Sequence, residues 1–401
     1  MASSKGRTSS AFLILCVMGG FAIFSSTMSK NPVLNPFATS LGTPTDWTGI
    51  VGAASTVPGI LVSLPAASLS DVLGRRKFLL VAAFVFASAP FLYLFITVWW
   101  QLILVRFYHG FATAIFVPVA EASVAEMFPD KRGERISLFS SATYVGRVIA
   151  PFLGGYILFV TADNYHALYL AVGVAGVTSL VTALLLLSEQ RPQTPTRATQ
   201  RQSIVSDLFS GWRTVIRNRS VVLVSFMQAS LFYTYGAVEY YLAGYLKNTL
   251  YFDFLLTGIV TGGLAALAII VRPCMGQLSD RTGRRIPIMV GLFVCSSPLL
   301  VIPFTDSFPV LLLLSLVYGL GFATVTASTP ALISELLPRE RVGMAMGFMD
   351  MTMDVGQTLG TIISGFILAT SLSYRGLFPS LGLLLLISCG IFALFLSKQR
   401  K

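Results

Sequence analysis

One short stretch, present twice, decides the fold of this 401-residue chain. It reads LSDVLGRR at residues 69–76 and, 209 residues later, LSDRTGRR at residues 278–285. Each copy joins two long apolar runs. Other pairs recur at nearly the same offset, such as Gly110 with Gly321 and Gly146 with Gly356. The sequence therefore contains two copies of one unit, arranged in the same direction along the chain.

The composition excludes a soluble domain. Hydrophobic residues make up 55% of the chain and charged residues only 11%, whereas a soluble domain carries about 25% charged residues. A transmembrane β-barrel is also excluded, because its strands would alternate in polarity over about 10 residues. The apolar runs here are longer and continuous, as in Phe78–Trp100 and Leu377–Leu396. We therefore expect an all-α membrane protein with twelve transmembrane helices, six in each copy.

The expected spans start with Ala11–Phe37 and Trp47–Leu69 and end with Gly376–Leu396. They predict an N-terminal six-helix half at residues 1–188, a cytoplasmic linker at 189–220 and a C-terminal six-helix half at 221–401. The first apolar run could also be read as a signal peptide. We expect it to be retained as a helix, because eleven further spans follow.

The distribution of basic residues predicts the topology. Most of the 28 Lys and Arg residues lie in loops on one side, together with both termini and the linker. The opposite loops carry only Lys247 and Arg375. The positive-inside rule therefore places both termini in the cytoplasm, in a plasma (inner) membrane protein. This explains the net charge of +11 without nucleic-acid binding.

The sequence lacks the residues that most enzymes and metal sites need. Its four Cys lie in apolar runs without metal-ligand spacing, and it has only two His. There is no Gly-x-x-x-x-Gly-Lys-Ser/Thr motif for a nucleotide. We expect no enzyme activity, no metal and no cofactor, so any transport would draw on a gradient.

The repeated stretch resembles the loop signature of the major facilitator superfamily, Gly-x-Leu-Ala-Asp-Arg-x-Gly-Arg-Arg. The second copy, residues 276–285, follows it nearly throughout; the first has Ala67 for the leading Gly and Val72 for the Arg. The resemblance covers essentially the whole chain. It implies two parallel six-helix halves that rock about a central site. It also implies a latch on the cytoplasmic side, formed by Asp71, Gly74, Arg75, Arg76, Asp280, Gly283, Arg284 and Arg285.

Shorter motifs are similar to those of the proton-coupled drug antiporters within this superfamily. Arg106 to Gly110 resembles their Arg-x-x-x-Gly motif, and residues 146–155 resemble Gly-x-x-x-Gly-Pro-x-x-Gly-Gly, with Ala150 in place of one Gly. Pro32 and Pro36 resemble the proline pair of the first span. The antiporter-like positions are Gly146, Pro151, Gly154 and Gly155.

Eight charged residues lie within the expected spans, where each costs at least ~2.5–3.5 kcal/mol at the bilayer centre if it faces lipid. They should therefore face a wet path or pair with each other. Arg272 and Glu121 can instead lie near helix ends and reach the interface. The other six are candidates for coupling and gating: Lys30, Arg106, Arg147, Glu239, Asp350 and Asp354.

Three arrangements are predicted for these charges. Lys30 and Glu239 are 209 residues apart, so they occupy equivalent positions and are expected to attract across the outer mouth. Asp350 and Asp354 share one helix face, and carboxylates so close together favour holding a proton. Arg147 is expected to contact Asp354. Arg106 is expected to exchange partners as a carboxylate protonates, to bind an anionic substrate, or to form a structural pair.

Together these features predict a secondary active transporter, acting as a monomer in the lipid bilayer. Its expected activity is proton-coupled efflux of small amphipathic or drug-like molecules. The four basic residues within the spans favour an alternative, uptake or exchange of a small organic anion. Aromatic residues that crowd spans 1 and 7 are candidates for an apolar substrate wall, namely Phe21, Phe24, Phe37, Phe232, Tyr233, Tyr235, Tyr240 and Tyr241.

Overall fold

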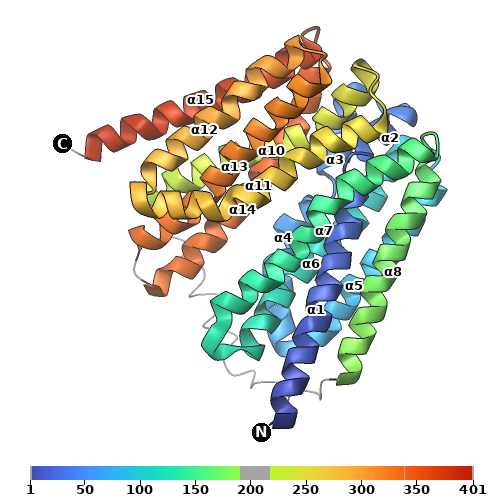
Figure 1. Ribbon diagram of the computed structural model, residues 1–401, viewed down its shortest axis with the longest axis vertical. Coiled ribbons are helices and arrows are strands. Elements are labelled where there is room, and N and C mark those ends of the chain that lie inside the picture. The colour runs from blue at the N-terminus through green and yellow to red at the C-terminus, as the bar shows by residue number, and fades with distance from the viewer. Residues whose placement is uncertain (1, 190–216, 338, 400–401) are drawn as a thin grey trace. The chain divides into compact units, whose positions relative to one another are not determined.

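The computed structural model describes residues 2–189, 217–337 and 339–399. These residues form helices joined by short turns, and none of them lies in a β-strand. Figure 1 shows the helices as long rods. The all-α fold expected from the apolar runs is therefore confirmed. Residues 190–216 of the predicted linker lie outside the described residues, whereas its last two residues, Arg219 and Ser220, already belong to a helix.

In the first half of the sequence the helices are α1 (Ala2–Met28), α2 (Leu34–Ser40), α3 (Thr45–Ala53), α4 (Val57–Leu73), α5 (Arg75–Leu92), α6 (Trp99–Met127), α7 (Arg132–Val160) and α8 (Tyr165–Glu189). In the second half they are α10 (Arg219–Gly244), α11 (Phe254–Thr282), α12 (Arg285–Val301), α13 (Phe308–Leu336), α14 (Arg339–Leu368) and α15 (Ser373–Gln399). Short 3₁₀ segments follow α5, α6 and α12, and a π-helical turn follows α10.

Ten helices of the described residues are long and apolar enough to cross a membrane, and one bent pair raises this to eleven. The bent pair is Thr45–Ser63 with Pro65–Leu73, at an angle of 50°. Proline lacks the N–H that a helix interior needs, which accounts for a bend at Pro65. The remaining long helix, α14, spans 30 residues and carries Asp350 and Asp354.

The first span was expected to be one helix, Ala11–Phe37, and this boundary is wrong. Helix α1 ends at Met28, the chain turns through residues 29–33, and α2 starts at Leu34. The turn contains Pro32, which cannot donate a backbone hydrogen bond. The second expected span, Trp47–Leu69, is likewise divided at residues 54–56 between α3 and α4.

The chain divides into two compact units. Unit 1 comprises Met1–Pro44, Ala54–Ala198 and Phe252–Gly258; unit 2 comprises Thr45–Ala53, Thr199–Tyr251 and Ile259–Lys401. Two short segments are thus exchanged between the halves of the sequence. With the offset of 209, residues 45–49 correspond to 254–258, so the exchange follows the repeat.

Equivalent helices pack in equivalent ways inside each unit. Helix α1 packs on α7 in unit 1, as α10 packs on α14 in unit 2. The pairs α5 with α8 and α5 with α6 correspond to α12 with α15 and α12 with α13. The sequence repeat is therefore also a structural repeat.

Candidate functional site

The first copy of the loop motif (residues 69–76) forms a network of charges within unit 1. Gly74 joins α4 to α5 with φ +96°, a conformation that suits glycine. Arg75 forms ion pairs with Asp71 and, at 2.7 Å, with Glu126 at the end of α6. Its guanidinium also donates to the Ser70 hydroxyl at 2.9 Å. The motif thus ties the ends of α4, α5 and α6 together.

The second copy (residues 278–285) repeats this network in unit 2. Gly283 has φ +81°, and Arg284 pairs with Asp280 and with Glu335, whose Oε1 lies 2.8 Å from its Nε. The hydrogen bond that Arg284 donates to Glu335 is the main reason that the pKa of Arg284 lies above its usual value. Burial opposes this rise and Asp280 adds to it.

Sequence reasoning missed Glu126 and Glu335. They are themselves 209 residues apart, a signal that could have identified them. Every motif contact described above lies inside one unit. The predicted role as a latch between the halves therefore stays a prediction.

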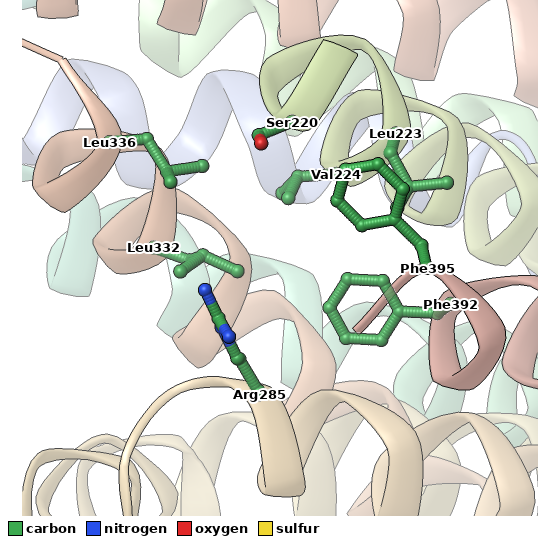
Figure 2. Close-up of a pocket in the computed structure, with 8 residues that line it drawn as sticks. All are labelled: Ser220, Leu223, Val224, Arg285, Leu332, Leu336, Phe392 and Phe395. Carbon is green, nitrogen blue, oxygen red and sulfur yellow. The ribbon is translucent and has the colours of Figure 1, made fainter. Parts of the chain in front are cut away.

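Arg76 and Arg285 are equivalent in the repeat, but their surroundings differ. Arg76 donates to the Leu186 carbonyl of α8, with an Nη2–O distance of 3.3 Å. Arg285 lines a pocket at one end of unit 2, together with residues of α10, α13 and α15 (Figure 2). The end of α12 in unit 2 is therefore surrounded differently from the equivalent end of α5 in unit 1.

Arg106 lies at the centre of a buried polar cluster in unit 1. Its side chain is 2% exposed, and it donates to the Ser55 hydroxyl and, at 3.5 Å, to the Tyr93 hydroxyl. The Tyr93 hydroxyl lies 3.4 Å from Nδ1 of His109, which follows Arg106 by about one turn of α6. No carboxylate among the described residues pairs with Arg106, and its Nε has no hydrogen-bond partner there. A buried cation with only neutral partners is costly, which indicates a role beyond packing.

Arg147 is exposed on α7, and its described contact is with the Tyr144 ring, 5.6 Å from the ring centre. The apolar side chains exposed on this helix include Val145, Ile149 and Tyr156. At about 100° per residue these lie roughly 160–200° around the helix from Arg147. Arg147 therefore points away from the side of α7 that is suited to lipid.

Asp350 and Asp354 have the same relation to the lipid-suited side of α14. Leu359 and Ile363 are exposed apolar residues of this helix, and they lie roughly 140° and 180° around it from Asp354. No basic side chain of the described residues pairs with either aspartate. The two carboxylates thus lie on the side of α14 opposite its exposed apolar residues, one turn apart and without a partner cation in the described part of unit 2.

A polar network connects α14 to its neighbours just beyond these carboxylates. Gln357 donates to Glu239 of α10, with an Nε2–Oε2 distance of 3.4 Å. Gln228 of α10 contacts the Met353 sulfur at 3.4 Å and accepts a 2.6 Å hydrogen bond from Thr329 of α13. The acidic residues therefore border a set of neutral polar groups on α10, α13 and α14.

Two of the predicted aromatic residues flank this network. Tyr235 stacks on Phe322 of α13 with ring centres 4.6 Å apart, and its hydroxyl donates to Glu239 at 3.5 Å. The Phe232 ring lies 5.4 Å from that of Phe322. Phe322 was not expected from the sequence as a wall residue. These rings offer apolar surface next to the Glu239 carboxylate.

The antiporter-like stretch brings helices into close contact. A Cβ on Gly146 would collide with the carbonyl oxygen of Gly20 in α1, and one on Gly155 with that of Phe254 in α11. A Cβ on Gly154 would lie 3.2 Å from the Met28 side chain, and Pro151 lies inside α7. Small residues therefore let α7 approach α1 and the start of α11 within unit 1.

Two predicted charge pairs join residues of different units. Lys30 and Arg147 belong to unit 1, and Glu239 and Asp354 belong to unit 2. Both pairs stay predictions. Arg272 donates to the Thr326 carbonyl at 3.4 Å within unit 2. Among the described residues no group of three or more His, Cys, Asp or Glu could hold a metal ion.

Known proteins match the chain over nearly all its length. The family model of the Major Facilitator Superfamily matches residues 11–305 and 257–401. An uncharacterised MFS-type transporter of Methanocaldococcus jannaschii is 24% identical over 343 residues, which cover 84% of this chain and 86% of the relative. A multidrug resistance efflux pump PmrA homologue of Lactococcus lactis is 24% identical over 389 residues, covering 90% of this chain and 89% of the relative.

Solved structures share the fold at lower identity. A bacterial homologue of the human lysosomal transporter Spinster superimposes with a TM-score of 0.81 and 16% identity, covering 97% of this chain and 96% of that one. The nucleoside transporter NupG gives 0.77 and 13%, covering 96% and 98%. With the repeated motif, the equivalent packing inside the two units and the family match in agreement, this chain belongs to the major facilitator superfamily of membrane transporters.

Proposed function

We propose that this transporter is a proton-coupled antiporter that expels small amphipathic or drug-like molecules by alternating access. The main support is the pair Asp350 and Asp354, which lies on the side of α14 away from its exposed apolar residues and has no described partner cation. The efflux pumps among its relatives, although only about 24% identical, favour the same function. The moving bodies would be the two six-helix halves, residues 1–188 and 221–401.

The chemistry follows from the charge of the two carboxylates. Close carboxylates share a proton readily, because both cannot remain charged at low cost. When the pair faces the cytoplasm and loses its proton, its negative charge, together with the rings of Phe232, Tyr235 and Phe322 beside Glu239, favours an amphipathic substrate. When it faces outward, binding a proton neutralises the site and releases the substrate. One site then serves two ligands in turn, which is the basis of exchange.

The orientation is part of the proposal. The basic loops support a plasma membrane protein with both termini in the cytoplasm. With this orientation, protons entering the cell down their gradient would drive the substrate outward.

Proton release from everted vesicles tests this function. Vesicles with an acidified lumen would receive a panel of amphipathic dyes, and a pH indicator would report lumenal alkalinisation. The wild type should alkalinise the lumen with at least one dye, and Asp354→Asn should reduce this at least tenfold. Dye counterflow without a proton gradient should persist in Asp354→Asn, because the site still binds and moves.

Asp130→Asn is the matched control, since it removes one carboxylate from an exposed turn outside the helices under discussion. It should behave as the wild type. If the double variant Asp350→Asn, Asp354→Asn retains dye-driven proton release, the proposed coupling is wrong.

A second candidate function is uptake or exchange of a small organic anion. The observation that favours it is Arg106, which is buried with neutral partners and an unused Nε donor. The same vesicles separate the two functions. Exchange of a labelled carboxylic acid without any proton flux, abolished in Arg106→Gln, would favour the anion and exclude the antiporter.

A further inference from the structure

His109 is a buried residue of unit 1 that the proposed function does not use. Its side chain is 2% exposed, and it follows Arg106 by three residues on α6, so both lie on one side of the helix. The Tyr93 hydroxyl lies 3.5 Å from Nη1 of Arg106 and 3.4 Å from Nδ1 of His109. Arg106 also donates to the Ser55 hydroxyl, at the break between α3 and α4. These four side chains form one connected polar chain.

The chemistry of the groups gives this polar chain a direction. An arginine side chain can only donate, so the oxygens of Tyr93 and Ser55 accept from Arg106. The Tyr93 O–H then donates to Nδ1 of His109, because it would otherwise have no acceptor among the described residues. Nδ1 accepts only when the ring proton is on Nε2. His109 is therefore a neutral imidazole whose acceptor keeps the Tyr93 oxygen directed at Arg106.

Unit 2 contains the same helix crossing, so the two units can be compared directly. A Cβ on Gly110 would collide with the Ser55 carbonyl oxygen, and one on Gly319 would collide with the Leu264 carbonyl oxygen. Gly319 follows Gly110 by 209 residues, and Leu264 follows Ser55 by the same number. The helices thus approach each other equally closely in both units, with equivalent residues in contact.

The polar chain itself is present in unit 1 only. The residues equivalent to its four members in unit 2 are Ile302, Leu264, Ser315 and Tyr318. Ser315, which replaces Arg106, donates to the Val260 carbonyl at 2.6 Å, so its hydroxyl is satisfied. In unit 1, by contrast, a cation is buried without a described carboxylate, and Nε2 of His109 has no hydrogen-bond partner there. Buried polar groups without partners are costly, so the stability of the crossing does not require these residues.

We propose that His109 and Tyr93 are positioning residues for transport and that they act through Arg106. They hold its guanidinium on the Ser55 hydroxyl, at the break between α3 and α4. The equivalent residues 263–265 lie within the continuous helix α11, so the break and the polar chain occur together in unit 1. This inference deepens the proposed function, since it rests on a role of Arg106 in transport.

Two variants of His109 separate its acceptor from its volume. In His109→Asn the amide oxygen takes the place of Nδ1, whereas His109→Gln carries the amide one bond further, toward the place of Nε2. Ethidium efflux from proteoliposomes should stay within twofold of the wild type in His109→Asn and fall at least fivefold in His109→Gln. Equal efflux rates in the two variants would overturn the proposal.

Tyr93→Phe removes the hydroxyl and keeps the ring, which stacks on Tyr169 with ring centres 4.3 Å apart. It should also slow ethidium efflux at least fivefold. The double variant Tyr93→Phe, His109→Gln should be no slower than the slower single variant, because both residues act through Arg106. Effects of the two substitutions that multiply would overturn the proposal.

Tyr108→Phe is the matched control, since it removes a hydroxyl from the same helix that bonds to Ser88 of α5 instead, at 2.8 Å. It should keep the efflux rate of the wild type. A loss equal to that of Tyr93→Phe would contradict the proposal, because it would show a general effect of hydroxyl groups between α5 and α6.

Hydrogen exchange of the purified protein tests the inference without any substrate. Amide exchange of residues 54–60, at the break and the start of α4, should be at least threefold faster in Tyr93→Phe and His109→Gln than in the wild type. It should be unchanged in His109→Asn. Unchanged exchange in Tyr93→Phe would overturn the inference. Absence of ethidium efflux in the wild type would count against the proposed function alone, and the exchange rates would then decide the inference.

Discussion

The arginine residues of this molecule lie in three different kinds of surroundings. Arg75 and Arg284 each bridge two carboxylates at the ends of helices, where partly exposed pairs contribute about 1 kcal/mol or less. Arg147 is exposed on the side of α7 opposite its exposed apolar residues. Arg106 is buried among neutral groups, where burial of its charge is not balanced by a described carboxylate.

The cost of this buried charge leads to a prediction for Arg106→Met. Replacing an uncompensated buried cation by an apolar side chain of similar length should raise stability, or leave it unchanged, while transport is lost. The melting temperature and dye efflux of the purified, reconstituted protein would be measured together. A lower melting temperature with normal efflux would show that Arg106 is a structural residue only.

Helix contacts depend on where glycine occurs. Gly146 allows α7 to lie directly on α1, and Gly155 and Gly258 allow α7 to meet the start of α11. In unit 2 the equivalent residues Gly356 and Gly365 face Ala229 and Tyr241. The same close approach thus recurs in both units, because the same small residues recur.

Gly146→Ala should therefore destabilise the protein, by about 1–3 kcal/mol as for other overpacked sites. The added Cβ would collide with the Gly20 carbonyl, so α1 and α7 must separate. Gly133→Ala is the matched control in the same helix, because no atom lies within 4 Å of its added Cβ. Thermal unfolding in detergent should show a loss for Gly146→Ala and none for Gly133→Ala. Equal melting temperatures would contradict the close packing.

The whole molecule consists of two units that exchange short segments. Residues 45–53 belong to the unit of the second half and residues 252–258 to that of the first. Residues 45–53 contain α3, and the next helix, α4, belongs to unit 1. Residues 252–258 include the start of α11, and the remainder of α11 belongs to unit 2. The chain therefore passes from one unit to the other at both ends of each segment, at residues 44–45 and 53–54 and at residues 251–252 and 258–259.

A charge exchange tests the predicted attraction between Lys30, in the turn after α1, and Glu239 of α10. Lys30→Glu and Glu239→Lys should each reduce transport at least tenfold, because each creates a like-charged pair at equivalent positions. The double variant should restore transport, because the two positions then again carry opposite charges that attract each other. Dye efflux from cells would be the measurement, with expression checked by immunoblot. Full activity in both single variants would exclude the pairing.

The sequence by itself determined the class, the repeat and the family. Lipid as the surrounding solvent requires long apolar helices, and duplication leaves an offset that can be read directly from residues 69–76 and 278–285. These features are local or periodic, so they can be recognised from the sequence without the tertiary structure. Even Glu126 and Glu335 could have been found from the same offset.

Only the tertiary structure decided which side chains meet. It showed the breaks after Met28 and Ala53, the stacking of Tyr235 on Phe322, the neutral surroundings of Arg106 and the different fates of Arg76 and Arg285. Contacts of this kind depend on how whole helices cross and how neighbouring volumes are filled. No pattern along a single helix contains that information.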